Sequence, residues 1–556
     1  MFLQKLTLSK FTKFTTRKGP LLLVILDGWG VGKEDQSNAI FRAKTPYMKA
    51  LEDEARKNHL YRTLKAHGPW VGLPSDKDMG NSEVAHNAMG AGRVYDQGAK
   101  LVNGAIASKK IFQTPVWKSL VQPVSQGSAT LHLIGLLSDG NVHSHIDQLF
   151  AILDELAAEG AKRVRIHPLL DGRDVPPKSG LKYIDMLETK LSELSTDKRA
   201  DYRIASGGGR MRVTMDRYNS DWNVVKRGWN AHVRGIPEHF EGYPGYFRSA
   251  REAIETARKA NPEIDDQYNP SFVIVDENGQ PVGKIRDGDS VIYFNYRGDR
   301  AIQISRAFEE KDFKEFDREE FPKVNYAGLL EYDGDYHIPK QYLVSPPDIQ
   351  EVLTQYLCGM GVHQFAIAET HKFGHVTYFW NGNFLGYIDK NLEEYVEIKS
   401  DPSEMIEKKP EMKARGVTDR LITVLNSEKF QFLRVNFANG DMVGHTGNMT
   451  ACIKATEVLD ECVGRLQKTI DELQGIMIVT ADHGNLEEKL EKDGSPKTAH
   501  TLNPVPFLVH DPQFKGEYAI DDYFKDAGIS SIAATILEIL GFTPPANYTP
   551  ALLKFK

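Results

Sequence analysis

The segment Ile476-Met477-Ile478-Val479-Thr480-Ala481-Asp482-His483-Gly484-Asn485 decides the fold class, because it joins an apolar run to a carboxylate and an imidazole. Four consecutive apolar residues followed by small and polar ones are typical of a buried strand and the loop after it. Open α/β sheets bind their ligands at that end of their strands. The segment therefore predicts an α/β protein with a site beside Asp482 and His483.

Two other apolar runs end in the same kind of loop. Leu21 to Leu26 leads into Asp27-Gly28, and Phe432 to Phe437 leads into Asn439-Gly440-Asp441-Met442-Val443-Gly444-His445. Because Asp441 and His445 are four residues apart, one helical turn would place both side chains on the same face. Three strand ends thus offer metal ligands.

The candidate ligands form two sets. One set is Asp441, His445 and His500, and the other is Asp27, Asp482 and His483. Mixed carboxylate and imidazole ligands suit Mn²⁺, Co²⁺ or Zn²⁺ better than a site of thiolates would. Two metals about 4 Å apart would clamp both the attacking and the leaving oxygen of a phosphoryl transfer.

A nucleophile for such a transfer is offered by Met79-Gly80-Asn81-Ser82-Glu83-Val84-Ala85-His86-Asn87. Ser82 lies between a glycine, Gly80, and a helix-forming run, so it could sit at a helix N-terminus, where free amides favour a bound phosphate. Coordination to a metal would lower its hydroxyl pKa. The alternative is that Ser82 only caps the helix. Ligand-type motifs at several strand ends favour the catalytic interpretation.

The composition is that of an ordinary globular protein without a membrane span. Lys plus Arg number 69 against 76 Asp plus Glu, and the net charge of −7 argues against a nucleic-acid surface. No run approaches the ~18 apolar residues of a membrane helix. Three scattered cysteines, Cys358, Cys452 and Cys462, do not suit a disulfide framework or a zinc ribbon, so we expect a reducing compartment.

Residues 1–20 form an N-terminal extension that is rich in Lys, Ser and Thr and contains no acid. This composition occurs in organelle transit peptides, although the segment is Lys-rich rather than Arg-rich. We expect either a targeting segment or, as the simpler alternative, a disordered extension. The alternatives for location are therefore the cytoplasm and a mitochondrion or other organelle.

Apolar runs alternate with helix-like stretches such as Ile146 to Gly160, which predicts largely parallel sheets. Further runs of strand length lie at Leu131 to Leu137, Val164 to Leu170, Tyr202 to Ala205, Val291 to Phe294 and Phe365 to Ala368. The metal-type motifs sit at the two ends of the chain, so one domain looks inserted into another. Turn-formers at Val94 to Gly98 and Val344 to Asp348 mark the crossings. Ser400 to Gly416 and Glu487 to Lys497 are predicted to be solvated charged loops.

The middle of the chain holds a second set of motifs, rich in arginine, after predicted strands. They are Ser138-Asp139-Gly140-Asn141-Val142-His143-Ser144-His145, Asp171-Gly172-Arg173-Asp174, Gly207-Gly208-Gly209-Arg210, Asp216-Arg217 and Tyr296-Arg297-Gly298-Asp299-Arg300. Planar guanidinium groups suit bidentate contacts with phosphate and carboxylate. Any single arginine could instead form a surface ion pair.

Taken together, Leu26-Asp27-Gly28-Trp29-Gly30, Met79 to His86, Gly440 to Gly447, Thr480 to Asn485 and His500 resemble the cofactor-independent phosphoglycerate mutases of the alkaline phosphatase superfamily. The resemblance runs from about Leu21 to the C-terminus. It implies that Asp441, His445 and His500 hold one divalent ion, and that Asp27, Ser82, Asp482 and His483 hold the other. Ser82 matches the serine that is transiently phosphorylated. Ala85 stands where the family motif usually has glycine, which implies tighter packing there.

The arginine-rich blocks resemble the transferase domain of the same family. By this resemblance the substrate contacts are His143, Arg173, Arg210, Arg217, Arg297 and Arg300, with Arg212 as an alternative to Arg210. Asp174 resembles the acid or base that handles the substrate hydroxyl. Lys372, in Glu369-Thr370-His371-Lys372-Phe373, resembles the lysine that neutralises the phosphoryl group.

The resemblance implies an alkaline-phosphatase-like metal domain at 21–96 and 346–556, with an α/β transferase domain inserted at 97–345. It also implies interconversion of 3-phosphoglycerate and 2-phosphoglycerate in glycolysis, through a phosphoserine and two divalent ions. We expect Mn²⁺, with Co²⁺, Mg²⁺ and Zn²⁺ as alternatives, no 2,3-bisphosphoglycerate, and a monomer. The competing interpretation is another superfamily enzyme, such as a phosphopentomutase or a metal-dependent phosphatase.

Overall fold

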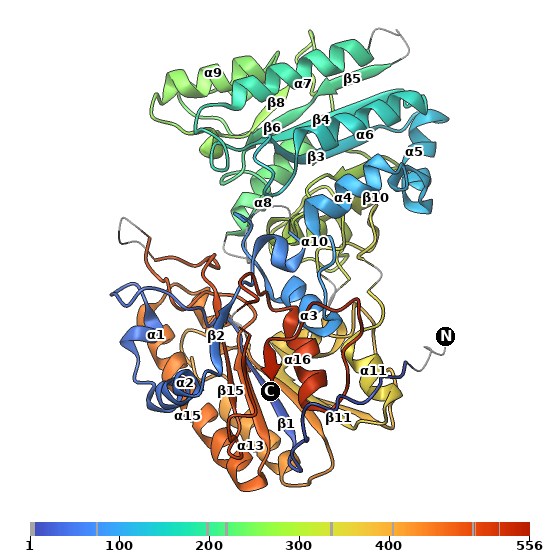
Figure 1. Ribbon diagram of the computed structural model, residues 1–556. Helices are drawn as coiled ribbons and strands as arrows, with labels where there is room; N and C mark the ends of the chain where they lie inside the picture. The colour runs from blue at the N-terminus through green and yellow to red at the C-terminus, as the bar shows by residue number, and fades with distance from the viewer. Residues whose placement is uncertain are drawn as a thin grey trace. The chain divides into compact units, whose positions relative to one another are not determined.

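The computed structural model describes residues 6–73, 76–195, 200–216, 221–333, 337–347, 349–402, 405–491, 494, 496–521 and 523–556. The chain divides into unit 1, Met1–Gln97 with Pro347–Lys556, and unit 2, Gly98–Pro346. The breaks after Gln97 and Pro346 fall in the two turn-rich stretches where we expected the chain to pass between the domains. Asp348, in the second stretch, lies outside the described residues. Each unit is built on a mixed sheet with helices, which confirms the α/β class (Figure 1).

Unit 1 has a seven-stranded sheet in the order β12-β11-β13-β1-β14-β15-β2. Its strands are β12 (Glu393–Ile398), β11 (Gln364–Glu369), β13 (Phe432–Phe437), β1 (Leu21–Leu26), β14 (Ile476–Thr480), β15 (Val505–His510) and β2 (Tyr61–Leu64). The pairs from β12 to β14 are parallel, and the pairs of β15 with β14 and with β2 are antiparallel. The predicted parallel arrangement therefore holds for the centre of the sheet.

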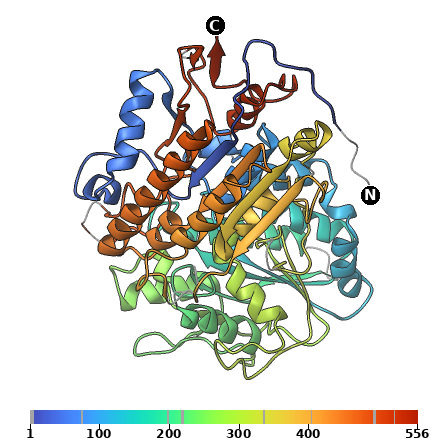
Figure 2. The same cartoon turned by 90° about the horizontal axis from the view of Figure 1, so that it is seen from below.

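The central strand β1 brings the two ends of the chain together. It pairs with β13 on one side, Leu21 opposite Phe432, and with β14 on the other, Leu21 opposite Ile476. Figure 2 shows this blue strand among the orange strands of the C-terminal half. All six residues of β1 are buried, as expected for a strand that is covered on both faces.

The helices of unit 1 cover this sheet. They are α1 (Ala39–Arg42), α2 (Pro46–Lys57), η1 (Gly68–Val71), α3 (Ser82–Ala91), α11 (Leu353–Gly359), α12 (Thr370–Gly374), η6 (His375–Phe379), α13 (Ala414–Leu425), α14 (Asn439–Gly444), α15 (Met449–Leu473) and α16 (Ser531–Ile539). A small sheet pairs β16 (Tyr518–Ile520) with β17 (Leu553–Phe555). Among the described residues, no helix is long and apolar enough to cross a bilayer.

The N-terminal segment is folded over its described part, residues 6–20, so the expectation of a disordered extension is wrong there. Phe14 is buried in the core of unit 1, where its ring meets those of Tyr518 and Phe555. Arg17 donates a hydrogen bond of 2.7 Å to Asp511 and one of 3.1 Å to Glu517. The composition of residues 1–20 could not predict this packing, because the partners of Phe14 and Arg17 lie far along the chain.

Replacing Phe14 with alanine should lower the free energy of unfolding by about 3 kcal/mol, because a buried ring is lost and a cavity remains. Urea unfolding followed by fluorescence measures this change. Phe41→Ala is the matched control, since that ring is 49% exposed and its loss should cost less than about 0.5 kcal/mol. Equal stability of the Phe14 variant and the parent would contradict the packing of this segment.

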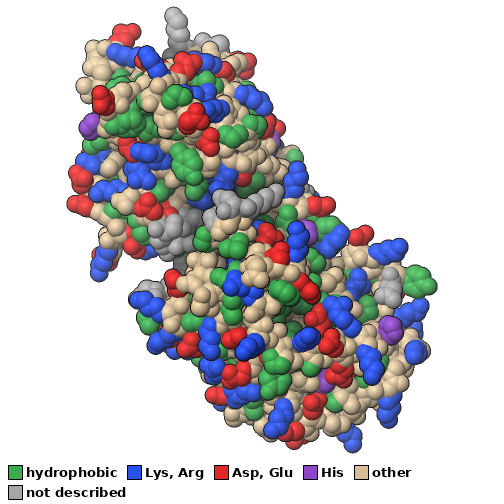
Figure 3. Space-filling model, turned by 90° about the vertical axis from the view of Figure 1, so that its left-hand side faces the viewer, with side chains coloured by type: hydrophobic (Ala, Val, Ile, Leu, Met, Phe, Trp, Pro, Cys, Tyr) green, Lys and Arg blue, Asp and Glu red, His purple; other side chains and the backbone are tan. Residues whose placement is uncertain are grey.

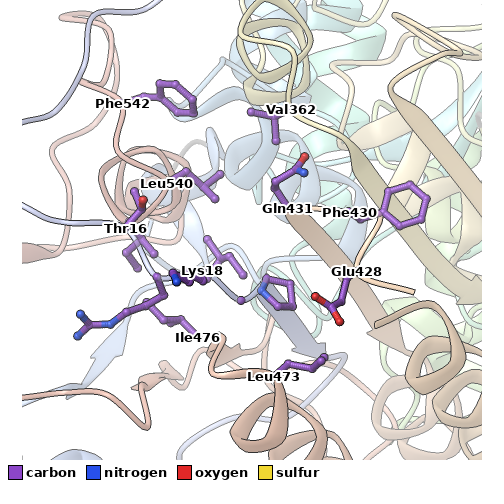
Figure 4. A pocket seen from close by; sticks show the side chains of 15 residues that line it. Thr16, Lys18, Val362, Glu428, Phe430, Gln431, Leu473, Ile476, Leu540 and Phe542 are labelled. Carbon is purple, nitrogen blue, oxygen red and sulfur yellow. The ribbon is translucent and has the colours of Figure 1, made fainter. Parts of the chain in front are cut away.

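A cavity of about 290 Å³ lies next to the same segment (Figure 4). Its lining includes Lys18, Leu21, Phe430, Ile476 and Leu540. Leu21 and Ile476 are the first residues of β1 and β14, so the cavity lies at the amino edge of the sheet. It contains none of the candidate ligands, which follow the carboxyl ends of the strands.

Unit 2 has an eight-stranded sheet in the order β10-β9-β3-β4-β6-β8-β7, with β5 paired to β4. The strands are β10 (Asn325–Gly328), β9 (Ser290–Tyr293), β3 (Leu131–Leu137), β4 (Arg163–Leu170), β6 (Ser206–Gly209), β8 (Phe272–Ile274), β7 (Tyr246–Phe247) and β5 (Asp201–Ile204). Only the β6–β8 pair among the described strands of this sheet is antiparallel. The predicted strands at Leu131, Val164, Tyr202 and Val291 are confirmed within one residue of their starts.

Two cores lie on the two faces of this sheet, because successive residues of a strand point to opposite sides. In β3, Leu131 and Leu133 join one core while Ile134 and Leu136 join the other. The helices of the first core are α4 (Gly98–Ala107), η2 (Ile111–Gln113), α5 (Pro115–Ser125), α6 (Ile146–Ala158), α7 (Gly180–Leu194) and α9 (Ala250–Ala260). Those of the second are α8 (Trp222–Trp229), η3 (Asn230–Arg234) and α10 (Ile302–Glu309), and η4 (Asp266–Tyr268) and η5 (Gly298–Arg300) are short turns.

The surface carries both signs of charge. On the face seen in Figure 3, lysine and arginine side chains are interspersed with aspartate and glutamate. This agrees with a net charge of −7 in a chain of 556 residues. An anionic ligand must therefore meet a local cationic site rather than a broad positive surface.

Candidate active site

Four adjacent parallel strands of unit 1, β11, β13, β1 and β14, end at the same edge and carry the candidate ligands into one place. Asp27 directly follows β1, and Asp482 follows β14 by two residues. Gly28 has a φ of +77°, and a Cβ added there would lie 2.7 Å from the backbone nitrogen of Asp441. A glycine at this position thus lets the loop after β1 approach the loop after β13.

Asp441, His445 and His500 converge although His500 lies on a separate loop. The Nε2 atoms of His445 and His500 each lie 3.0 Å from Asp441 Oδ1, and 3.1 Å from one another. The other ring nitrogen of each histidine donates to a backbone carbonyl: His445 Nδ1 to that of Thr498 at 2.7 Å, and His500 Nδ1 to that of Gly80 at 2.8 Å. These second contacts orient both rings toward the aspartate.

The second set lies directly beside the first. His483 Nε2 is 3.6 Å from Asp27 Oδ1, 3.5 Å from Asp482 Oδ2 and 3.9 Å from Asp441 Oδ1. Among the described residues, two further groups have ligand atoms within 4.8 Å of one another: Asp27 with Asp482 and His483, and Asp441 with His483 and His500. His483 therefore belongs to both groups, whereas the sequence placed it in one.

Ser82 is the first residue of α3, and its hydroxyl faces the ligands. The helix cap is Asn81, whose side chain accepts from Val84, so Ser82 is free of the capping role that was its alternative interpretation. Ser82 Oγ lies 3.0 Å from His483 Nε2 and 2.5 Å from Lys372 Nζ. It is 5% exposed at a helix N-terminus, where backbone amides favour an anion. Ala85, on the same helix, is fully buried.

The electrostatics of this cluster are dominated by buried carboxylates. Burial and the charge of Asp482 raise the pKa of Asp27 to about 6. Burial lowers the pKa of His500 to about 3 and lowers that of His483 as well, so both imidazoles are neutral at pH 7. Burial alone would lower the pKa of Lys372, but Asp27 and Asp441 outweigh it and raise that pKa.

These residues fit divalent metal ions. Asp27, Asp441 and Asp482 are at least 96% buried, and within the described part of the chain Lys372 is the one lysine or arginine that pairs with them. Three buried carboxylates against one ammonium leave negative charge that bound cations would offset. Neutral imidazoles and carboxylates are also the donor types of Mn²⁺, Co²⁺ and Zn²⁺ sites.

Three polar residues near the ligands were not named as site residues from the sequence. Asn436 donates 2.7 Å to Asp27 Oδ2, His86 Nδ1 lies 2.8 Å from the carbonyl of Ser82, and the Asn485 amide donates 3.2 Å to Asp441 Oδ1. Asn436 could have been found, because an asparagine inside a buried strand needs a hydrogen-bond partner.

The prediction of a solvated charged loop from Glu487 to Lys497 is wrong at its start. Glu487 is 1% exposed and Lys489 is 0% exposed. Charge patterning cannot reveal burial when the partners are uncharged backbone and side-chain groups, several of them on other loops. Residues 492, 493 and 495 of this stretch, and 403 and 404 of the stretch Ser400 to Gly416, lie outside the described residues.

Unit 2 gathers its arginine-rich motifs at the carboxyl ends of β9, β3, β4 and β6, which are also adjacent. Arg210 is 1% exposed; it donates 2.8 Å to Asp171 Oδ1 and also to Asp174 Oδ2. Arg300 donates 2.7 Å to the carbonyl of Met215. Burial, and then the charge of Arg210, lower the pKa of His143 well below its usual value, so that imidazole is neutral.

The remaining predicted contacts differ in their surroundings. Arg297 Nε lies 3.2 Å from Asp299 Oδ1, while Arg173 is exposed. Arg212 pairs with Glu238 at 2.8 Å, away from the Asp171 and Asp174 carboxylates. Arg217 lies outside the described residues.

The α/β fold and the buried carboxylate and imidazole cluster define the class of a metal-dependent enzyme, and the sequence model of the Metalloenzyme superfamily matches residues 19–544. A probable 2,3-bisphosphoglycerate-independent phosphoglycerate mutase of Leptospira interrogans is 50% identical over 98% of both chains. The 2,3-bisphosphoglycerate-independent phosphoglycerate mutase of Trypanosoma brucei brucei is 46% identical over 99% of both chains. The chain belongs to the family of 2,3-bisphosphoglycerate-independent phosphoglycerate mutases.

A solved structure supports the same assignment. The crystal structure of Leishmania mexicana phosphoglycerate mutase at low cobalt concentration matches with a TM-score of 0.73 and 45% identity, over 99% of this chain and 100% of that one. The chain is therefore a glycolytic isomerase that acts on phosphoglycerate without 2,3-bisphosphoglycerate. The family expected from the sequence motifs is confirmed.

Proposed function

We propose that the mutase reaction passes through a phosphoserine at Ser82, and that the ligand cluster of unit 1 is where the phosphoryl group is transferred. The observation that carries this proposal is the position of Ser82 Oγ, 3.0 Å from His483 Nε2, 3.3 Å from Asp27 Oδ1 and 2.5 Å from Lys372 Nζ. A serine that faces metal-ligand side chains at a helix N-terminus has the surroundings of an activated nucleophile.

We assign the ligands of two divalent ions to the two sets implied by the family resemblance, Asp441, His445 and His500, and Asp27, Ser82, Asp482 and His483. When bound, such ions would supply positive charge that lowers the pKa of the serine hydroxyl and offsets the charge of the phosphoryl group. Mn²⁺ is our preferred metal, with Co²⁺, Mg²⁺ and Zn²⁺ as alternatives.

Within unit 1, Ser82, Lys372 and the backbone amides of α3 each have a separate role in the transfer. Ser82 Oγ attacks phosphorus, the bond from phosphorus to the glycerate oxygen breaks, and the proton that Ser82 gives up ends on that oxygen. Lys372 Nζ, which lies 2.9 Å from Asp441 and beside Ser82, holds a positive charge against the transferred group. The amides at the start of α3 add partial positive charge at the same place.

In unit 2 we propose that His143, Arg173, Arg210, Arg217, Arg297 and Arg300 bind the substrate anions. Asp174 would take the proton from the glycerate hydroxyl that accepts the phosphoryl group back, as the bond from phosphorus to Ser82 Oγ breaks. The Arg210–Asp174 pair supports this assignment, because it fixes the carboxylate of Asp174. Since Arg212 pairs with Glu238 instead, Arg210 is the better candidate of the two.

Asp174→Asn should leave phosphorylation of Ser82 detectable but slow the mutase rate by about 10² to 10⁴-fold, because an amide cannot accept the hydroxyl proton. Single-turnover kinetics with mass spectrometry of the Ser82 peptide measures both quantities. The variant keeps the hydrogen bond of Arg210 to Asp171, so the local fold should persist.

Asp147→Asn is the matched control for this substitution. It makes the same chemical change at a side chain that is 80% exposed on α6, and its rate should equal that of the parent. A normal rate in Asp174→Asn would overturn the proton-transfer role. Absence of any phosphoserine in the parent during turnover would overturn the phosphoserine itself.

We further propose a monomer in a reducing compartment, most simply the cytoplasm. The three cysteines are free and buried, which supports a reducing environment. The alternative of an organelle depended on residues 1–20, and the described part of that segment is built into unit 1 through Phe14 and Arg17. We therefore propose that residues 6–20 stay in the working enzyme.

A further inference from the structure

Glu487 is a buried carboxylate with no assigned role, on the loop that follows the ligands Asp482 and His483. It is 1% exposed, and within the described part of the chain no lysine, arginine or histidine forms an ion pair with it within 4 Å. The Lys489 ammonium interacts with its charge over a longer distance. A charge in such a position must be compensated by hydrogen bonds. The hydrogen-bond partners of the Glu487 carboxylate therefore indicate which parts of the structure it holds in place.

Those partners come from three separate loops. One carboxylate oxygen accepts from the backbone nitrogens of Gly30, at 3.1 Å, and Asn485, at 2.9 Å. The other accepts from the hydroxyl of Thr501 and, at 3.0 Å, from the amide of Asn503. The loops are those that carry Asp27, Asp482 with His483, and His500.

The fit around this carboxylate is tight. A Cβ added at Gly30 would lie 2.3 Å from its carboxyl carbon, and one at Gly484 would lie 2.3 Å from its oxygen. Gly32 leaves similar room, at 2.7 Å from its Cγ. Glycines on the neighbouring loops thus allow the backbone to close around Glu487.

Lys489, two residues after Glu487, makes similar hydrogen bonds beside the remaining ligands, Asp441 and His445. Its ammonium is fully buried and donates 2.9 Å to the carbonyl of Gly444, next to His445, and also to the side-chain oxygen of Asn485. The Asn485 amide nitrogen is thereby turned toward Asp441, to which it donates at 3.2 Å. Glu487 holds the same asparagine through its backbone.

We propose that Glu487 is a positioning residue of the metal centre, whose carboxylate ties the three ligand-bearing loops together. The inference rests on the proposed metal site and deepens it. Because outer groups that orient metal ligands typically account for about 10 to 100-fold in metal affinity, the effect should appear in binding itself and not only in turnover.

Glu487→Gln tests this directly. The amide has the same shape, but its NH₂ replaces one acceptor oxygen. If the NH₂ faces the backbone N–H groups of Gly30 and Asn485, two hydrogen bonds are lost. If it faces Thr501 and Asn503, both side chains must reverse from donor to acceptor. In chelator-treated full-length protein, we expect the Mn²⁺ dissociation constant from titration calorimetry to rise by about 10 to 100-fold. Thr501→Val, which removes one donor and keeps the charge, should raise it less.

Glu488→Gln is the matched control. It removes the same charge one residue away, from a side chain that is 41% exposed and paired with Lys497. Because its hydrogen bond from Asn503 is long, at 3.4 Å, this change should affect Mn²⁺ affinity little. Circular dichroism and thermal unfolding of the chelated proteins check that each variant is folded.

The outcomes separate the inference from the site on which it rests. If the parent binds Mn²⁺ and folded Glu487→Gln binds it equally well, the positioning role is overturned. The same holds if Glu488→Gln weakens binding as much, since charge alone would then explain the loss. A parent that binds no divalent ion would overturn the metal centre, and this inference with it.

Discussion

Ser82→Ala is expected to lower the mutase kcat by at least about 10⁴-fold, because the proposed reaction has no other group to carry the phosphoryl between the two hydroxyls. Ser82 Oγ contacts Asp27, His483 and Lys372, and α3 keeps its Asn81 cap without it. The loss should therefore be one of chemistry while the fold persists.

Steady-state kinetics, circular dichroism and phosphopeptide mass spectrometry measure these effects together. Ser119→Ala, at an exposed serine of α5, is the control and should retain the parental rate. A near-parental rate in folded Ser82→Ala would rule out the phosphoserine route. The family assignment would stand, but the transfer would need another nucleophile.

Removal of divalent metal should have a comparably large effect, reducing activity to background. Asp27, Asp441 and Asp482 are buried with one lysine as counter-charge, and the serine hydroxyl would lose the charge that activates it. Mn²⁺ or Co²⁺ should restore more activity than Ca²⁺, which prefers six to eight oxygen ligands rather than a site containing imidazoles.

The test is dialysis against a chelator, metal analysis of the product, and addition of single metals. The chelated protein should also unfold at a lower temperature, because a ligand that binds only the folded state stabilises it. Full activity in protein shown to be metal-free would contradict the two-metal site. Recovery with Ca²⁺ equal to that with Mn²⁺ would contradict the assigned ligand types.

The strands and the edge at which the ligands gather could be predicted from local sequence. Each run of apolar residues at Leu21, Phe432 and Ile476 is a strand as expected, and each is followed by an acidic or imidazole side chain. These features are local, since a parallel strand covered on both faces is mostly apolar and the ligand side chains come after its end, although β13 also carries the buried Arg434 and Asn436.

Other features depend on contacts that no local pattern encodes. Phe14 sits in the core of unit 1 because of the distant rings of Tyr518 and Phe555, so the composition of residues 1–20 misled the prediction. Glu487 and Lys489 have the charge pattern of a surface loop, yet their hydrogen bonds go to Gly30, Thr501 and Gly444.

The sequence by itself determined the α/β class, the family, and the types of side chain that could bind metal and phosphate. The tertiary structure decided which of them meet: His483 lies between both ligand groups, and His500 reaches Asp441 from another loop. Residue types and strand periodicity are properties of short segments. The distance of 3.6 Å between Asp27 and His483, which lie hundreds of residues apart in the chain, arises only when β1 pairs with β13 and β14 and their following loops meet at one edge of the sheet.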